Sequence, residues 1–199
     1  MKKLGYVICG LFFLALSTQA KAVLLSLEPS SQTVNASSTV AVDLVISGLG
    51  NFAPDSLGDF DINIAFDDSA LSFQGYSLGS HLGDLGLAQA IDFSNGDLGG
   101  GLVNVSEVSL LPVVDLDLLQ PDSFTLASFS FLVDGLAPGG STIISIDDVL
   151  ALGDGFGNPL SVDGTSDAII QVAVAASEPP VALLLVAGLI GYAMRRKAC

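Results

Sequence analysis

Short runs in which apolar and polar residues alternate fill most of the chain between residues 23 and 174. In the clearest run, 39–47, aliphatic residues recur at every second position, which is the period of a β-strand with one buried face. The run 59–66 alternates in the same way, with Asp59, Asp61 and Asn63 on its polar side. The core residues predicted for these two strands are Val40, Val42, Leu44, Ile46, Phe60, Ile62, Ile64 and Phe66.

Turn residues (Gly, Pro, Asp, Asn and Ser) separate these runs and further short runs of the same kind. In the run 124–133 the pattern shifts by one position near its middle, and 116–122 fits either a helical turn or a loop. Many short strands with few helix signals predict an all-β protein, an antiparallel β-sandwich of about nine strands. The remaining predicted strands are 23–28, 70–73, 88–93, 102–110, 124–133 (core side Phe124, Leu126, Phe129, Phe131 and Val133), 142–146, 149–152 and 167–174.

Charge divides the chain into a middle and two ends. All six Lys and Arg residues lie before residue 22 or after residue 194, whereas all but one of the 21 Asp and Glu residues lie between 28 and 167. A surface with carboxylates and no cations repels nucleic acid, because it cannot neutralise phosphates. The sequence therefore predicts no nucleic-acid partner, and it disfavours phosphorylated substrates for the same reason.

The first residues have the layout of a secretory signal peptide. Lys2 and Lys3 precede an apolar run, 4–16, which is followed by Ala20-Lys21-Ala22. The sequence predicts a signal peptide over residues 1–22, with cleavage after Ala22 or Ala20, and a β-sandwich domain over residues 23–176. The alternative is an uncleaved N-terminal helix, although the apolar run is short for a membrane span.

The last residues, 177–199, have the layout of a membrane-inserted tail. The tetrapeptide Ser177-Glu178-Pro179-Pro180 precedes an uncharged apolar run, 181–194, and Arg195-Arg196-Lys197 follows it. As a helix, these 14 apolar residues would span about 21 Å, less than the roughly 30 Å hydrocarbon core of a bilayer. Cations after an apolar run stay on the cytoplasmic side. The pattern predicts a short transmembrane helix.

This tail resembles the PEP-CTERM sorting signal of Gram-negative bacteria. The resemblance covers 177–197 and rests on Glu178-Pro179, the short apolar helix and the basic cluster Arg195, Arg196 and Lys197; the family pattern opens Pro-Glu-Pro, where this chain has Ser177-Glu178-Pro179. It implies an exported, inner-membrane-anchored precursor that exosortase, a membrane-embedded enzyme, processes, and then a location at the cell surface or outside the cell. An ordinary C-terminal transmembrane anchor is the alternative.

Residues 23–174 resemble the cohesin-like domains, which are nine-stranded jelly-roll sandwiches related in fold to some carbohydrate-binding modules. The segments VDLVISGL (42–49), FDINIAFD (60–67), LSF (71–73), Leu78-Gly79 and DGFGNPL (154–160) carry this resemblance. Most of them are core and turn positions, so they report fold rather than activity. In the cellulosome, a cohesin binds the calcium-loaded dockerin of an enzyme.

Catalysis is not predicted, and no catalytic residue is assigned. His81 is the only histidine, and it lies in the sequence GSHLG, which contains no nucleophile motif and is interpreted as an exposed loop. Two carboxylates can cleave sugars without a histidine, but a sandwich without Trp offers little to line a deep cleft.

Calcium is the one candidate cofactor, because it takes six to eight oxygen ligands and acidic turns supply them. The tentative metal residues are Asp67, Asp68, Asp154 and Asn158; further acidic candidates are Asp115, Asp117, Asp147, Asp148 and Asp163. None of these turns matches an EF-hand loop. The competing interpretation is that these aspartates are solvated and accept hydrogen bonds from backbone amides of their own turns.

The features together predict a non-catalytic exported cell-surface or extracellular-matrix protein. The sorting-signal resemblance implies a link to biofilm or exopolysaccharide production, with exosortase as a partner. The alternative is a carbohydrate-binding or dockerin-type protein-binding module, with a polysaccharide or another surface protein as its partner and calcium as a candidate requirement. Sugar binding has little support from residue types, because the domain holds no Trp and a single Tyr, Tyr76, on which a sugar ring could stack.

Overall fold

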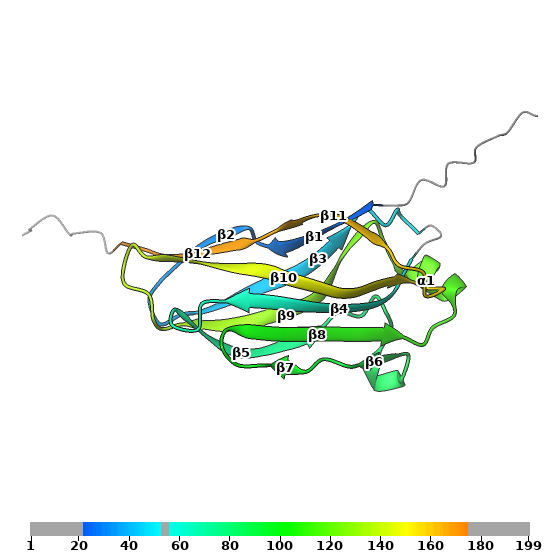
Figure 1. Cartoon of the computed structure of the whole chain (residues 1–199), viewed down its shortest axis with the longest axis horizontal. Coiled ribbons are helices and arrows are strands. Elements are labelled where there is room, and N and C mark those ends of the chain that lie inside the picture. Colours follow the sequence, from blue (N-terminus) through cyan, green and yellow to red (C-terminus); the bar gives the residue numbers. More distant parts are fainter. Residues whose placement is uncertain (1–21, 53–55, 175–199) are drawn as a thin grey trace, which may run out of the picture.

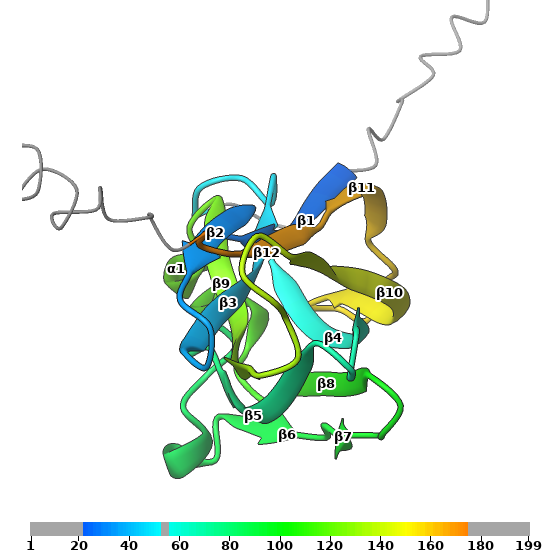
Figure 2. The ribbon, with the colours of Figure 1, turned by 90° about the vertical axis from the view of Figure 1, so that its left-hand side faces the viewer.

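Two β-sheets pack against each other in the computed structural model, which describes residues 22–52 and 56–174 (Figure 1). Figure 2 shows the two layers end-on. The first sheet has the order β11 (Ser161–Ser166), β1 (Ala22–Glu28), β3 (Thr39–Ser47), β9 (Ser123–Val133), β5 (Leu71–Leu78). The second has the order β2 (Ser31–Val34), β12 (Ala168–Val172), β10 (Ser141–Asp154), β4 (Leu57–Phe66), β8 (Leu102–Ser109), β6 (Ala90–Asp92), and β7 (Gly96–Asp97) also pairs with β8. Two short helices complete the described chain, the 3₁₀ helix η1 (Leu85–Leu87) and α1 (Val113–Leu119).

Both terminal strands pass from one sheet to the other. The first strand breaks at Pro29, because proline cannot donate to a strand ladder, so β1 belongs to the first sheet and β2 to the second. The final strand divides in the same way around Asp167 into β11 and β12. Each half pairs with the corresponding half of the other strand in parallel, β1 with β11 and β2 with β12.

The hydrophobic core fills the space between the sheets with the residues that alternation predicts. Val40, Val42, Leu44 and Ile46 of β3 are at most 3% exposed. Within β9, Ala127 pairs with Leu44 and Thr125 with Val45, so Leu126 is the extra residue of a bulge, at the place of the predicted shift in the pattern. The other predicted core residues of β4 and β9 are also buried, with one exception, the half-buried Phe66: Phe60, Ile62, Ile64, Phe124, Leu126, Phe129, Phe131 and Val133.

The predicted all-β sandwich is confirmed, but three details of the predicted antiparallel arrangement of about nine strands are wrong. The described chain contains twelve strands, because β2, β7 and β11 are separate segments with little hydrophobic signal. Two pairings are parallel. The predicted strands 142–146 and 149–152 form one strand, β10, which stays paired with β4 through irregularities in register. The ambiguous segment 116–122 overlaps the helix α1, which begins directly after Pro112 and ends before Gln120.

The predicted signal peptide, except for its last residue, Ala22, lies outside the described residues, as does the predicted sorting segment 177–199. Within the described residues, no helix has the length and apolar character needed to cross a membrane. The two ends of the described chain point away from each other, with the start of β1 at the same end of the sandwich as α1 and the end of β12 at the opposite end (Figure 1).

A close backbone approach fixes the turn between β7 and β8 against the end of β4. Gly101 has a φ of +77°, and its carbonyl accepts a hydrogen bond from the Phe66 N–H at 2.8 Å. A Cβ atom added at Gly101 would collide with the carbonyl oxygen of Phe66. Gly99, two residues earlier, has a similar φ of +79° but faces open space. Of these two glycines, Gly101 alone combines a left-handed backbone with a packing contact.

We expect Gly101→Ala to lower the free energy of unfolding by at least about 3 kcal/mol, since it adds a steric overlap to left-handed strain. Gly99→Ala is the matched control and should cost only about 1 kcal/mol, because strain is its only penalty. Urea denaturation of the two variants measures both values. Equal losses in the two variants would contradict the close approach.

Candidate functional site

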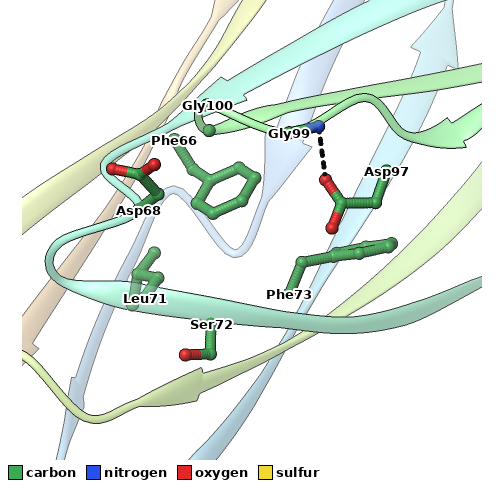
Figure 3. Close-up of a pocket in the computed structure, with 9 residues that line it drawn as sticks. Phe66, Asp68, Leu71, Ser72, Phe73, Asp97, Gly99 and Gly100 are labelled. Carbon is green, nitrogen blue, oxygen red and sulfur yellow. Dashed lines mark hydrogen bonds between the residues drawn. The ribbon is translucent and has the colours of Figure 1, made fainter.

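A cleft of about 280 Å³ opens at one edge of the sandwich, between β5 and the glycine turn that joins β7 to β8 (Figure 3). β5 is the edge strand of the first sheet, and β7 lies at the edge of the second, so the cleft forms where the two layers meet. The turn after β4 closes its third side. The residues that line it are Phe66, Asp68, Leu71, Ser72, Phe73, Asp97, Gly99, Gly100 and Gly101.

Two half-buried phenylalanine rings form the apolar wall of this cleft. The ring centroids of Phe66 and Phe73 are 6.5 Å apart. Both rings pack on the buried Phe131, at 5.1 Å and 5.6 Å, so the cluster continues into the core. Alternation predicts Phe66 as a core residue. Part of this residue stays accessible because Phe66 is the last residue of β4. The sequence gives no signal that these two phenylalanines, rather than others, border a cleft.

Two carboxylates stand on either side of the aromatic wall. The Oδ1 atom of Asp97 accepts a hydrogen bond from the Gly99 N–H at 2.9 Å, which orients the carboxylate over the cleft beside Phe73 (Figure 3). Asp68, on the opposite side of Phe66, is exposed and makes no side-chain hydrogen bond with another described residue. An apolar wall between two hydrogen-bond acceptors can hold a small polyhydroxyl or cationic group.

The cleft contains no arrangement for nucleophilic catalysis. Its one hydroxyl, on Ser72, donates a hydrogen bond of 2.6 Å to Oδ2 of Asp134 and does not face a histidine. His81 lies near the other end of β5. The expectation of an exposed loop histidine is wrong, because the His81 ring is half-buried and stacks on Phe124 with a centroid distance of 4.6 Å. Burial lowers the pKa of His81, and its Nδ1 atom has no hydrogen-bond partner among the described residues.

The four tentative metal residues lie in two separate turns. Asp67 and Asp68 follow the last residue of β4, whereas Asp154 is paired with Leu57 at the first residue of that strand. A ten-residue strand is roughly 30 Å long, so these residues cannot serve one ion. Within the described residues, no group of three or more His, Cys, Asp or Glu side chains is arranged to hold a metal. Calcium binding at either turn alone stays a prediction.

Both turns use their aspartates as backbone caps. Oδ1 of Asp154 accepts from the N–H groups of Phe156 and Asn158, and Oδ2 accepts from Asn158 Nδ2, at 2.8–2.9 Å. Burial opposes ionisation of Asp154, but these hydrogen bonds outweigh it and lower the pKa of the carboxyl. The hydroxyl and N–H of Ser69 lower the pKa of Asp67 in the same way. The geometry matches the competing interpretation, in which these aspartates accept hydrogen bonds from backbone N–H groups of their own turns.

One acidic side chain is buried without a partner. Glu107 lies on the core-facing side of β8, is fully buried, and neither of its carboxylate oxygens has a hydrogen-bond partner among the described residues. Burial, assisted by the negative charge of Asp92, raises its pKa to about 7. The protonated form is therefore the one that the fold accommodates. Sequence reasoning missed this residue, because a Glu in an alternating strand is usually placed on the solvent side.

The other predicted site residues fall at or beyond the ends of the described chain. Ala22, the predicted signal-peptide cleavage position, is the first residue of β1 and lies opposite Ser161 of β11. Ala20 and the sorting-signal residues lie outside the described residues, so these assignments stay predictions: Glu178, Pro179, Arg195, Arg196 and Lys197.

Comparisons with known proteins identify the fold. No protein-family model matches the sequence, and a search of curated proteins gives no match. Solved structures do match, and cohesin modules are among them. The sixth cohesin of Acetivibrio cellulolyticus scaffoldin B, in complex with a mutant Cel5 dockerin, is 17% identical with a TM-score of 0.61, over 76% of this chain and 99% of that chain.

Two further cohesins are similar to the same extent. The seventh ScaB type I cohesin of Pseudobacteroides cellulosolvens is 14% identical with a TM-score of 0.59, over 79% of this chain and 96% of that chain. A type III cohesin from the cell-surface anchoring scaffoldin ScaE of Ruminococcus flavefaciens is 15% identical with a TM-score of 0.55, over 81% and 93%. The chain therefore has a cohesin-like jelly-roll sandwich, and at this identity the likeness is one of fold.

The buried Glu107 should make stability depend on pH. Its pKa is about 7 in the folded chain against an ordinary 4.5, so the folded state binds the proton more tightly than the unfolded state. Between these two pH values the free energy of unfolding should fall as pH rises, by up to about 3 kcal/mol from this group alone.

Glu107→Gln keeps the shape of the side chain and removes the titration. We expect this variant to be more stable than the wild type at pH 8 and to show a smaller loss between pH 4.5 and pH 8 in thermal or urea unfolding. A variant that is less stable than the wild type at pH 8 would contradict the unpartnered burial of this carboxylate.

Proposed function

We propose that this protein is an exported, non-catalytic binding module that holds another protein at or outside the cell surface. The observation that carries the proposal is the cohesin-like sandwich, because one of the similar structures is a cohesin in complex with a dockerin and another comes from a cell-surface anchoring scaffoldin.

The charge of the module limits the kind of partner. The described residues contain no Lys or Arg, so the surface that they present to a partner has no cation of these two types and many carboxylates. A partner that supplies cations, as Lys and Arg side chains or as bound calcium, gains electrostatic complementarity and fast association.

The proposed path to the cell surface depends on the two ends of the chain. In this proposal residues 1–22 direct export, the segment 177–199 anchors the precursor in the inner membrane, and exosortase removes that segment by recognising the signal around Glu178 and Pro179. The exposed module then takes part in an extracellular matrix, with a link to biofilm or exopolysaccharide production. The sequence features of the ends support this part of the proposal.

Carbohydrate binding in the cleft is the second candidate function. The wall formed by Phe66 and Phe73 provides an apolar surface for a sugar ring, and Asp68 and Asp97 provide acceptors for its hydroxyl groups. Both rings are half-buried, so the stacking surface is smaller than that of an exposed Trp or Tyr.

We expect the tagged full chain, in a neutral detergent, to retain a protein partner from the extracellular fraction of the cells that produce it. Because the module is anionic, raising the salt from about 0.1 M to 1 M should weaken retention, as the screening length falls from about 10 Å to 3 Å. Mass spectrometry identifies the retained protein, and repeating the experiment with calcium and with a chelator tests calcium dependence. Retention of polysaccharide without protein would contradict the main proposal.

A glycan array probed with the full chain tests the second candidate. If a glycan binds in the cleft, Asp68→Asn should weaken its signal by about tenfold, because an exposed carboxylate acceptor is replaced without disturbing a turn. Asp148→Asn, an exposed carboxylate on β10, is the matched control and should leave the signal unchanged. A glycan signal that is insensitive to Asp68→Asn would place the sugar elsewhere.

A further inference from the structure

The end of the sandwich that carries α1 lies opposite the end where β12 leaves the described chain (Figure 1). Several segments at the α1 end carry large apolar side chains that are exposed to solvent. Six of them, each 40–72% exposed, are called here the apolar end. They come from three segments that are distant in sequence: the turn after β3, the segment from the end of β8 through α1, and the turn after β10. The six residues are Phe52, Leu110, Val114, Leu118, Leu119 and Phe156.

Backbone contacts hold these three segments together. The N–H of Phe52 donates a hydrogen bond of 3.1 Å to the carbonyl of Gln120, directly after α1. The turn that carries Phe156 packs on the other end of the helix, since the Cα of Gly155 lies so close that a Cβ there would be 3.1 Å from Val113. Within α1, Val114 and Leu118 are four residues apart and project from the same side.

The fold does not require these side chains to be apolar. Leu116 is the one buried residue of α1. The buried Gln120 then fastens the end of the helix, because its side chain bonds both backbone groups of Leu57 and the carbonyl of His81 at 2.7–3.0 Å. Val114 and Leu118 remain 68% and 71% exposed on this anchored helix.

Phe52 adds a second observation. Its φ is +51°, a left-handed conformation that is unfavourable for a bulky aromatic residue. The residue is 53% exposed, so its side chain contributes little to the core in return for the strain. Strained residues with exposed side chains are concentrated at binding surfaces, where the surrounding structure holds them in place.

Charge decides which occupant fits the apolar end. Asp115 and Asp117 lie on the same helix, Asp122 follows it, and the described residues hold no Lys or Arg to balance them. Oδ1 of Asp117 is buried and has no hydrogen-bond partner among the described residues. An anionic membrane surface would be repelled by these carboxylates, and a second copy of the chain would bring the same charges.

We propose that the apolar end is a docking surface for an amphipathic segment of a partner protein, one whose apolar residues are flanked by Lys or Arg. This inference rests on the proposed protein-binding function and names the surface that performs it. Since β12 ends at the far end of the sandwich, a chain anchored through its C-terminus presents the apolar end away from the anchor.

The probe is a fluorescent amphipathic helical peptide of about 18 residues, with Leu on one face and Lys beside it. Its binding to the full chain, held in nanodiscs of zwitterionic phosphatidylcholine, is measured by fluorescence anisotropy. We expect a Kd in the range of about 1–100 μM. A second peptide with Glu in place of each Lys should bind at least about tenfold more weakly, because only the charge is changed.

Leu118→Asn should weaken binding of the Lys peptide by about tenfold or more, as expected for a central apolar contact. Leu150→Asn, a leucine on β10 that is 56% exposed and lies outside the apolar end, is the matched control and should stay within about twofold of the wild type. Circular dichroism verifies that both variants are folded. Equal weakening by the two substitutions, or no binding of the Lys peptide, would overturn the proposal.

Two other occupants would also overturn it. A concentration-dependent dimer in sedimentation experiments that Leu118→Asn abolishes would assign the surface to a second copy of the chain. Binding to vesicles containing phosphatidylglycerol that the same variant loses would assign it to a membrane. If the wild type and Leu118→Asn retain the same natural partner equally, the docking surface is wrong while the protein-binding function stands. If the peptide binds as expected and no natural partner is retained, the surface stands and the proposed function fails.

Discussion

The absence of Lys and Arg from the β module is the constraint on which the rest of its structure depends. Its carboxylates cannot form ion pairs with such cations, and several of them instead accept hydrogen bonds from backbone N–H groups and from neutral side chains. Asp154 caps its own turn through three such bonds, and Asp61 accepts from the buried Asn104 at 2.6 Å. A carboxylate that accepts hydrogen bonds from the backbone of its own turn also fixes the conformation of that turn. Acidic residues therefore shape turns that border the cleft and the apolar end.

The two surfaces lie where the layers of the sandwich are incompletely covered. In the long strands, alternation places most apolar side chains in the core. The apolar side chains that border the two surfaces therefore come from strand ends and from the connections between strands. Phe66 borders the cleft because it is the last residue of β4, and the apolar end exists because α1 buries only Leu116. Function in this module is therefore more readily sought at the ends of the sheets than on their faces.

Much of the fold could be predicted from the sequence, because a period of two in β3, β4 and β9 reports burial directly. The shift within β9 was visible for the same reason, and the structure places a bulge there. The short strands β2, β7 and β11 could not be predicted, since their formation depends on partners distant in sequence rather than on their own pattern. The burial of Glu107 and His81 and the partial exposure of Phe73 could not be predicted for a related reason. Neighbouring elements decide how exposed these side chains are, and the local sequence pattern does not report those neighbours.

The crossing of both terminal strands between the sheets has a mechanical consequence. The last described strand, β12, lies between β2 and β10 and runs parallel to β2. In the proposed anchored state, a pull on the C-terminal side of β12 that is resisted at the α1 end acts along the strand axes, while the ladder hydrogen bonds run across them. Such a load is shared by the bonds on both sides of β12 at once instead of breaking them in sequence. The arrangement is suited to a module that transmits tension between an anchor and whatever it holds.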